Sequence, residues 1–462
     1  MIDRATLPLY LRGRFAPVPE EHGAAGLTVR GTLPPDLDGR YLRNGPNPLP
    51  GQDKGHWFTG PGMLHGIRLC NGRAEWYRNR WVRTRELEGH PFIREDFTVD
   101  LATTPANTHV IRHAGIVLAL CEVGLPHWVT PDLETVGPYD FEGRLTTAMT
   151  AHPKEDPVTG ELHLFGAGFA PPYLTYHRVT AEGLLLDSRP VDVPGPTMMH
   201  DFAITEHHIV WMDLPVVFDP ALAGRGGMPY RWDEAYGARL GIMSRTPGST
   251  DVRWYDIDPC YVFHVGNAHE DAEGRIVLDA VRYDHFGFQQ AWTDIGGSAG
   301  PGGPVGPGRP AGVREPGRSR APSVLHRWTL DPATGRVTES RLDDGEAEFP
   351  THDETFTGRP NRYLYTVSGD GIAKHDLIDR TSRAHETPGS RHAGEAVFVP
   401  AADGTGEDEG WLLSLVSNDD GEAGELLVLD AAQMSVQALV ELPHPVPAGF
   451  HGSWLPEPVH RR

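Results

Sequence analysis

Cysteine is scarce in this sequence. The 462 residues include three cysteines, Cys70, Cys121 and Cys260, which lie far apart and form no CxxC pair. An odd number of isolated cysteines indicates no disulfide framework, and the missing paired spacing argues against a zinc ribbon. Such use of cysteine is typical of a reducing compartment, so we expect a cytoplasmic protein.

Positive charge and long apolar runs are also lacking. The chain carries 41 Lys and Arg against 63 Asp and Glu, a formal net charge of −22, and has no basic run. Because nucleic-acid binding depends on basic side chains that neutralise phosphates, we expect no nucleic-acid partner. No stretch approaches the roughly 20 apolar residues of a membrane span, and residues 1–19 lack the apolar core of a signal peptide. We expect a soluble protein whose contact with a membrane, if any, is peripheral.

Turn-forming residues are plentiful, with 54 Gly and 42 Pro. No 15-residue window has a convincing 3.6-residue apolar period, so we expect few helices. Between the turns lie short runs of strand length: Ala74–Arg83, Ile116–Leu120, Leu162–Phe165, His208–Leu214, Arg275–Tyr283, Arg362–Val367 and Trp411–Val416. Many short strands predict a sandwich, a barrel or a propeller, and 462 residues exceed the roughly 250 that one sandwich uses.

The length therefore favours an all-β fold in which residues 1–462 form one β-propeller. Blades of roughly 40 to 50 residues with inserted loops would give about seven of them. We expect loops and short helices to cap the face that holds the functional site. Residues 296–322 are dense in Gly, Pro and Arg with scarcely any aliphatic side chain. Such a segment cannot bury a core, and it predicts a flexible surface insertion.

Four of the 24 histidines stand in apolar or small-residue settings beside turns: His152, His200, His264 and His451. Their separations of 48, 64 and 187 residues exclude ligands on one helix, as in HExxH. In a propeller the innermost strand of each blade runs along the central axis, so side chains from four blades can meet there. Four neutral imidazoles suit Fe, Cu, Ni or Zn, and the lack of Asp/Asn-rich loops argues against calcium. Taken singly, each remains more simply an ordinary histidine at a strand end.

Three glutamates lie in apolar, strand-like surroundings: Glu122, Glu348 and Glu395. A metal-bound imidazole usually donates its other N–H to a carboxylate, so glutamates of this kind are expected beside such a site. The last two are 47 residues apart, about one blade. A lone Glu beside apolar neighbours is otherwise more often exposed on the outer side of a strand, because burying its charge unpaired is costly.

Several short motifs carry a resemblance to a known family. They are Tyr41-Leu42-Arg43-Asn44-Gly45-Pro46-Asn47-Pro48, His56-Trp57-Phe58, Gly62-Met63-Leu64-His65-Gly66, Thr150-Ala151-His152-Pro153-Lys154, Met199-His200-Asp201-Phe202, Phe263-His264 with Asn267-Ala268, Glu348-Phe349-Pro350, Gly394-Glu395 with Phe398-Val399-Pro400, and Gly449-Phe450-His451-Gly452-Ser453-Trp454. In this order and spacing, the chain resembles the carotenoid cleavage oxygenases, relatives of retinal pigment epithelium isomerohydrolase and the lignostilbene dioxygenases, over nearly its whole length.

The resemblance implies a seven-bladed propeller with Fe(II) on its axis, ligated by His152, His200, His264 and His451. It implies that Glu122, Glu348 and Glu395 hydrogen-bond to the ligands. The implied reaction is cleavage of a C=C double bond of a carotenoid or apocarotenoid with O₂ as co-substrate, which gives two carbonyl products without a general acid or base. An apolar small molecule is the expected partner, and no obligatory protein partner is inferred.

The chain departs from the family pattern at several positions. Phe58-Thr59-Gly60-Pro61-Gly62-Met63 lacks two acids that the family usually has, and Thr351 and Ala401 replace basic residues. Stilbene-cleaving relatives carry a lysine directly before the first glutamate, whereas this chain has Cys121, which disfavours a phenolic stilbene. Lignostilbene-like cleavage, a retinoid-type isomerohydrolase and a non-catalytic polyene-binding propeller remain alternatives.

Two aromatic residues next to these motifs, Phe58 and Trp128, are candidate walls of a substrate tunnel. Plain core packing accounts for them equally well. The apolar loop from Pro215 to Tyr230 is a candidate for membrane contact, and a buried cap over the propeller explains it equally well.

Overall fold

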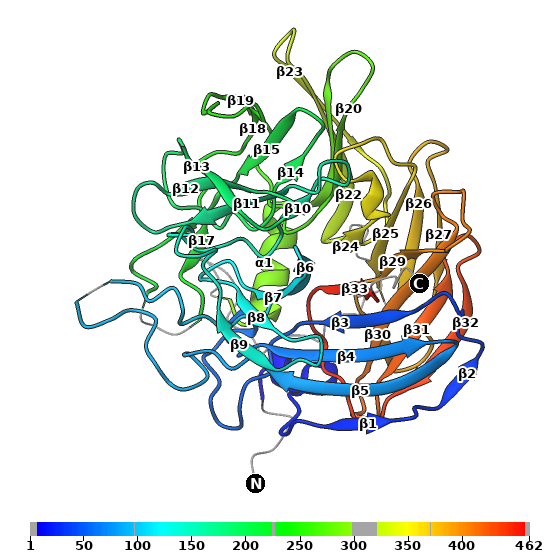
Figure 1. Cartoon of the computed structure of the whole chain (residues 1–462). Helices are drawn as coiled ribbons and strands as arrows, with labels where there is room; N and C mark the ends of the chain where they lie inside the picture. Colours follow the sequence, from blue (N-terminus) through cyan, green and yellow to red (C-terminus); the bar gives the residue numbers. More distant parts are fainter. Residues whose placement is uncertain (1–6, 97, 224–226, 298–320, 370, 458–462) are drawn as a thin grey trace.

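The computed structural model describes residues 7–96, 98–223, 227–297, 321–369 and 371–457. These residues form a ring of seven antiparallel sheets, the blades of a β-propeller. In Figure 1 the colours follow the ring from blue through cyan, green and yellow to orange, and the red strand β33 returns beside the blue strand β3. The predicted all-β propeller is therefore confirmed.

The first four blades contain the following strands. Blade 1 is β1 (Gly23–Ala25), β5 (Arg73–Trp81), β4 (Met63–Cys70), β3 (Gly39–Arg43) and β33 (Gly452–Pro456). Blade 2 is β6 (His109–His113), β7 (Ile116–Leu120), β8 (His127–Val129) and β9 (Thr135–Pro138). Blade 3 is β10 (Lys154–Glu155), β11 (Leu162–Ala167), β12 (Leu174–Val179) and β13 (Leu185–Val191). Blade 4 is β14 (Ala203–Ile204), β15 (His208–Asp213), β18 (Arg239–Ser244) and β19 (Val252–Asp256).

The remaining three blades complete the ring. Blade 5 is β20 (Val265–Glu270), β21 (Ile276–Tyr283), β22 (Ser323–Asp331) and β23 (Arg336–Arg341). Blade 6 is β24 (Glu348–Thr351), β25 (Tyr363–Ser368), β26 (Gly371–Asp376) and β27 (Thr381–His385). Blade 7 has β28 (Arg391–Ala393) and β29 (Val397–Pro400) both paired with β30 (Gly410–Asn418), followed by β31 (Glu425–Asp430), β32 (Ser435–Glu441) and β2 (Val29–Gly31).

The two ends of the chain close the ring. Strand β2, from the N-terminal part, pairs with β32 at the outer edge of blade 7, and the C-terminal β33 pairs with β3 as the inner strand of blade 1. Inner strands of neighbouring blades contact each other, for example β33 with β6 and β29, and β20 with β14 and β24. A closed ring leaves only short, protected strand edges, and it fixes the start of each inner strand at the central axis.

The blades follow from alternation and turn chemistry. Strand β5 alternates buried and more exposed residues, as a half-buried strand should, whereas β30 is buried along most of its length between neighbouring sheets. Asp156 accepts backbone N–H bonds from Val158 and Thr159 and so stabilises the turn between β10 and β11. The seven strand runs expected from the sequence coincide with β5, β7, β11, β15, β21, β25 and β30, so they are confirmed.

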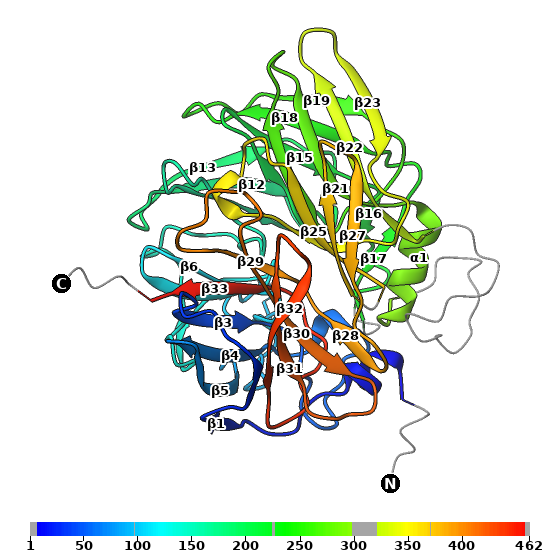
Figure 2. The same ribbon diagram turned by 90° about the vertical axis from the view of Figure 1, so that its right-hand side faces the viewer.

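A cap of short elements packs together beside the blades. It comprises the hairpin β16 (Val216–Phe218) and β17 (Tyr230–Trp232), helix α1 (His285–Asp294) and the 3₁₀ turn η4 (Trp57–Thr59). Trp292 of α1 packs against Phe58, and Phe288 of α1 packs against Trp232. Figure 2 shows α1 next to β16 and β17 at one side of the ring. The other 3₁₀ turns are η2 (Leu9–Leu11), η3 (Gly13–Phe15) and η5 (Glu354–Phe356).

The sequence also predicted a flexible surface insertion and no membrane-spanning segment. Of the insertion expected over residues 296–322, residues 298–320 lie outside the described residues. In the described part of the chain, no helix is both long enough and apolar enough to span a membrane.

Candidate metal centre

The four histidines singled out in the sequence all lie just before the innermost strand of a blade. His152 precedes β10, His200 precedes β14, His264 precedes β20 and His451 precedes β33. Blades 3, 4, 5 and 1 therefore each contribute one imidazole. Because inner strands begin at the same end of the central channel, residues far apart in sequence meet at one point.

The imidazoles converge closely. One ring nitrogen from each of His152, His200, His264 and His451 lies within 4.8 Å of the corresponding nitrogen of the other three, and all four residues are buried. The Nε2 atoms of His152 and His200 are 3.0 Å apart. The structure thus brings together the complete set of candidate ligands that the sequence predicted.

Each of three imidazoles is bonded to one of the predicted glutamates through its outer nitrogen. The Nδ1 atom lies 2.9 Å from Glu122 Oε1 in His200, 2.5 Å from Glu348 Oε2 in His264 and 2.8 Å from Glu395 Oε1 in His451. A carboxylate accepts only, so Nδ1 carries the proton and donates it. The Nε2 lone pairs of the three rings are therefore directed toward the common centre.

Electrostatics keep two of the rings neutral. Burial lowers the pKa of His152 and His451 well below 6.5, and the neighbouring histidines lower it further. Burial alone would raise the pKa of Glu348, but His264 outweighs it, so that carboxyl group stays ionised while the pKa of His264 rises. The partner of His451 differs, because burial raises the pKa of Glu395 to about 7, so Glu395 is the accepting carboxylate for His451 above that pH. A neutral imidazole is the form that binds a metal ion.

This arrangement fits a bound cation. Lone pairs on Nε2 atoms 3.0 Å apart repel each other unless a proton or a positive ion lies between them. His451 Nε2 is buried without a hydrogen-bond partner. Four imidazole nitrogens at one point, without thiolates or additional carboxylates in the set, suit first-row transition metals such as Fe, Cu, Ni or Zn. The four buried histidines could therefore hold a metal ion.

The glutamates are themselves held in place. Glu348 also accepts hydrogen bonds from the Tyr283 hydroxyl at 2.7 Å and from the Phe349 backbone N–H at 2.5 Å. Phe349 has a positive φ of 48°, unusual for a non-glycine residue, and its ring stacks on His264 with centroids 5.0 Å apart. Glu395 accepts a second bond from the Gly452 N–H at 2.7 Å. These contacts fix the ring orientations from outside the ligand set.

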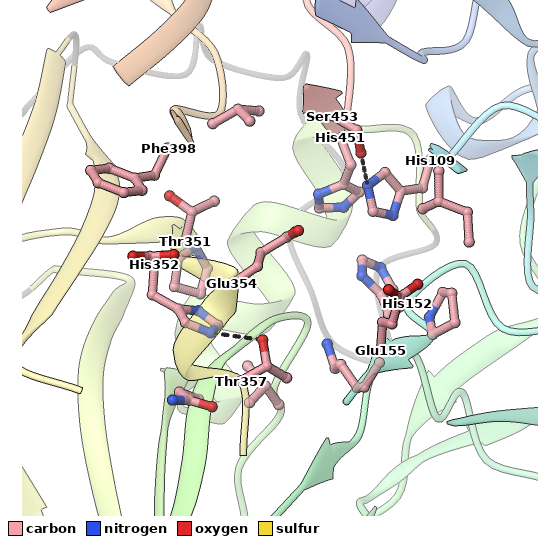
Figure 3. A pocket seen from close by; sticks show the side chains of 18 of the residues that line it. His109, His152, Glu155, Thr351, His352, Glu354, Thr357, Phe398, His451 and Ser453 are labelled. Carbon is pink, nitrogen blue, oxygen red and sulfur yellow. Dashed lines mark hydrogen bonds between the residues drawn. The ribbon is translucent and has the colours of Figure 1, made fainter. Parts of the chain in front are cut away.

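A cavity of about 460 Å³, lined by both polar and apolar side chains, opens beside the histidines, and Figure 3 looks into it. His152, His264 and His451 line it together with the polar residues His109, Lys154, Asp201, Thr351, His352 and Glu354. In Figure 3 the His109 ring lies next to His451, with Ser453 hydrogen-bonded to it. His109 was not among the predicted site residues. Its position at the start of β6, the inner strand of blade 2, could have identified it once the blades were known.

Aromatic side chains cover another side of the site. Phe263, next to His264, packs edge-on against the His200 ring at 5.9 Å and against Phe58 at 6.2 Å. Phe58 also contacts Phe450, which precedes His451, at 5.4 Å. None of these three aromatic residues lines the cavity described above. Phe58 therefore belongs to an apolar layer that reaches the ligands through their direct neighbours in sequence.

Trp128, the other candidate tunnel wall, is not brought to the site. It lies on β8, the third strand of blade 2, between buried His127 and Val129, and is 41% exposed. Successive side chains of a strand point to opposite faces, so the burial of its neighbours turns Trp128 toward solvent. Trp128 is therefore not among the predicted residues that the structure brings to the histidines.

The fold and the site together define a class: a seven-bladed β-propeller whose inner strands present four buried histidines and three hydrogen-bonded glutamates on the axis. Residues 15–456 match the family model described as retinal pigment epithelial membrane protein. A carotenoid cleavage oxygenase of Mycobacterium tuberculosis is 37% identical, with 97% of each chain covered. Carotenoid 9,10(9',10')-cleavage dioxygenase 1 of Arabidopsis thaliana is 33% identical over 99% of this chain and 92% of the relative.

Solved structures of similar enzymes share the fold over nearly the whole chain. The lignostilbene dioxygenase of Pseudomonas brassicacearum superposes with a TM-score of 0.83 at 28% identity, covering 98% of this chain and 99% of that one. The cobalt-substituted apocarotenoid oxygenase of Synechocystis gives 0.81 at 27% identity, covering 97% and 98%. The chain belongs to the carotenoid cleavage oxygenase family, and its relatives that are named carotenoid cleavage dioxygenases are oxidoreductases.

Proposed function

We propose that the protein is a non-haem iron(II)-dependent dioxygenase that cleaves a C=C double bond of a carotenoid or apocarotenoid with O₂ and releases two carbonyl products. The observation that carries the proposal is the meeting of four buried imidazoles on the propeller axis, three of them oriented by glutamates. Relatives that cover nearly the whole chain are named as carotenoid cleavage enzymes, which supports iron among the metals that such a site suits.

In this proposal His152, His200, His264 and His451 hold the metal, and Glu122, Glu348 and Glu395 fix three of the rings. Bound iron(II) supplies the redox chemistry that addition of O₂ to a double bond requires. Addition of both oxygen atoms across one C=C bond turns it into two C=O groups without net gain or loss of protons. No side chain therefore needs to act as a general acid or base, and the protein has to orient the substrate and exclude water.

The apolar layer of Phe58, Phe263 and Phe450 supports a polyene substrate. These rings lie beside the ligands and do not line the cavity of Figure 3. Aromatic faces pack well against a flat, conjugated chain and leave no polar group in need of a partner. We propose that the cleaved double bond lies on this side of the histidines.

A phenolic stilbene is the second candidate, because a lignostilbene dioxygenase is among the similar structures. Recognition of a phenolate requires a positive or strongly donating group. At the position where stilbene-cleaving relatives carry lysine, burial raises the pKa of the Cys121 thiol to about 12, so the side chain stays neutral. This residue favours the carotenoid or apocarotenoid over the phenolic stilbene.

A peripheral contact with a membrane would give access to such apolar substrates. Phe169 is 40% exposed and packs against Phe218 of β16 at 4.6 Å, and Phe286 at the start of α1 is 64% exposed. Both lie near the β16–β17 hairpin, since Trp232 of β17 stacks on His285. We propose this apolar edge as the point of contact, in keeping with the loop from Pro215 to Tyr230.

The test is an assay of anaerobically purified, iron-loaded protein exposed to O₂ with an apocarotenal and, separately, with a hydroxylated stilbene. We expect one O₂ consumed and two carbonyl products formed for each apocarotenal, and slower or no turnover of the stilbene. Isomerised product, or none with either compound, would contradict the proposal. Faster cleavage of the stilbene than of the apocarotenal would show that stilbenes are the substrate class.

The variant that tests the proposed ligand set is His200→Ala. We expect loss of stoichiometric iron and a fall in activity of more than about 100-fold, since partners outside the ligand set alone are worth about 10–100-fold. The fold should persist, because blade packing and not the metal supplies the core. His177→Ala is the control, because His177 is equally buried but bonds Thr147 and Ser188 in blade 3, away from the ligands. Iron retained by His200→Ala would remove that residue from the ligand set.

A further inference from the structure

One carboxylate touches three of the four chain segments that carry the histidines. Asp201 follows His200 directly, and its Oδ2 accepts the backbone N–H of Val265, the residue after His264, at 2.8 Å. Its Oδ1 lies 2.8 Å from Nζ of Lys154, two residues after His152. Asp201 Oδ1 also accepts the N–H of Phe202 at 2.7 Å. Blades 3, 4 and 5 are thus joined at the level of the metal centre by a single side chain.

The fourth segment is joined by another residue. The Nδ1 atom of His109 lies 3.0 Å from the backbone oxygen of Ala151, next to His152, and its Nε2 lies 3.3 Å from Ser453 Oγ, two residues after His451. An N–H that donates to the Ala151 carbonyl leaves the lone pair on Nε2 to accept from the Ser453 hydroxyl. His109 therefore connects blades 1, 2 and 3, and the bridges reach all four ligand segments.

These bridges differ in kind from the glutamate contacts. Glu122, Glu348 and Glu395 each bond the Nδ1 atom of one imidazole and so set how that ring is rotated. Asp201 instead accepts two backbone N–H bonds, from Phe202 and Val265, and pairs with a lysine; none of these partners is a ring nitrogen of a ligand. Its contacts join the strand starts that carry the rings.

The Asp201–Lys154 pair is costly to bury, which argues that its geometry matters. The Asp201 side chain is 2% exposed and the Lys154 side chain 19% exposed. A buried ion pair is often no more stabilising than an apolar replacement of the same shape, while the loss of one partner leaves an uncompensated charge. Lysine is also rare here, with Lys54, Lys154 and Lys374 the three in the whole sequence.

We propose that Asp201, with Lys154 as its counter-ion, is a positioning residue that sets the distances among His152, His200 and His264. The inference rests on the proposed function, because it assumes that these histidines hold a metal. It adds a role for two residues that touch neither the metal ligands' ring nitrogens nor the apolar layer. A pair that serves only general stability would leave the geometry of the bound metal unchanged when it is removed.

The experiment uses Asp201→Asn and Lys154→Gln in the full chain, loaded with Co(II) as a spectroscopic probe or with Fe(II). Asn can still accept one N–H but loses the charge that holds Lys154. We expect each variant to bind metal about tenfold more weakly or worse in chelator competition, in line with the effect of outer partners on metal sites. The visible absorption bands of Co(II) should shift, because they report the arrangement of the four nitrogens. In the metal-free protein the Val265 amide should exchange its hydrogen faster.

The chain offers matched controls. Asp213 of blade 4 is fully buried and bonds Arg239 at 2.9 Å and the Tyr236 hydroxyl at 2.8 Å, without contact to a ligand segment. Lys374 of blade 6 is likewise buried and pairs with Asp408. Asp213→Asn and Lys374→Gln should lower thermal stability as much as the test variants, with unchanged metal affinity and Co(II) spectrum.

The outcomes separate the two proposals. If wild-type protein binds no Co(II) or Fe(II) through nitrogen ligands, the proposed function fails and the inference with it. If wild-type protein binds metal, and the Asp201→Asn and Lys154→Gln variants show wild-type affinity and spectrum, the inference alone is overturned. If Asp201→Asn does not fold, Lys154→Gln decides, because it leaves the Asp201 hydrogen bond to Val265 in place.

Discussion

At the level of single residues, Glu348 has the most varied hydrogen-bond partners among the three glutamates that bond the candidate ligands. It accepts hydrogen bonds from His264, from the Phe349 backbone and from Tyr283, an aromatic residue of blade 5 that no sequence motif marks. The His264 bond sets the tautomer of a candidate ligand, whereas the Tyr283 bond only holds the carboxylate. The two contacts should therefore differ in what their removal costs.

We expect Glu348→Gln to weaken metal binding by roughly 10- to 100-fold, because the negative charge that strengthens His264 as a ligand is lost. Tyr283→Phe should weaken it less, since Glu348 keeps its other two bonds. Metal affinity from chelator competition checks both. Tyr176→Phe is the control, because Tyr176 also bonds a buried histidine, His163, but away from the metal centre. Equal effects of Tyr283→Phe and Glu348→Gln would contradict this ranking.

Residue types and motifs were enough to single out the four histidines that converge and the three glutamates that bond three of them, because each stands in a distinctive local sequence. They were not enough to assign a role to Asp201 and Lys154. These two residues lie inside the same motifs, but their proposed role depends on contacts between blades that the sequence does not show. Trp128 lies apart from the site for a local reason, since strand alternation turns its side chain toward solvent. His109 carries no local signal that separates it from the other histidines.

The inner strands bring histidines that are far apart in the sequence together at one site. Each candidate ligand lies one to three residues before such a strand, so a displaced strand moves its histidine. We expect His451 to be the most sensitive to such a displacement. Its strand, β33, comes from the far end of the chain and is held in blade 1 by pairing with β3. The tight approach of the two strands depends on Gly39. A Cβ at that position would lie 2.5 Å from the Leu455 carbonyl oxygen and 2.6 Å from the Trp454 ring.

We expect Gly39→Ala to lower the free energy of unfolding by about 1–3 kcal/mol, the usual cost of overpacking. Because β33 must shift to make room, metal affinity should fall as well, through His451. Chemical denaturation and chelator competition measure the two effects. Gly23→Ala in β1 of the same blade is the control, since a Cβ there meets atoms at an ordinary 3.7 Å. Unchanged metal affinity in a destabilised Gly39→Ala variant would show that β33 does not transmit the shift.

Elements were predictable where turns and β-rich runs alternate, as in β7, whose bounds match the expected Ile116–Leu120. The two-residue inner strands β10 and β14 were not predictable, because strands this short leave no periodic pattern. Their existence depends on pairing with β11 and β15, a tertiary property. The closure of blade 7 by β2 and of blade 1 by β33 is likewise invisible in local sequence.

At the scale of the whole molecule, the propeller buries many histidines as neutral rings. Burial is the first cause in each case, and it lowers the pKa to about 3 or 4 at His56, His109, His127, His163, His177, His326 and His352. In the unfolded chain these side chains titrate near 6.5. Their pKa is depressed on folding, so the stability they confer is present above about pH 6.5 and is lost as the pH falls toward 4.

Each such histidine adds about 1.4 kcal/mol per pH unit to the slope of stability between these limits, because the unfolded state binds one more proton. His163 provides a single-site test, since it is wedged between the Tyr176 hydroxyl at 2.6 Å and an Arg245 nitrogen at 2.8 Å, and protonation would set two cations face to face. We expect His163→Gln, which can make both hydrogen bonds without titrating, to reduce the slope between pH 6 and pH 4.5 by about one proton. Denaturation at several pH values measures it, with pH 8 as the internal control, where this residue should add no slope. A variant with the wild-type slope would show that His163 is already protonated in the folded protein.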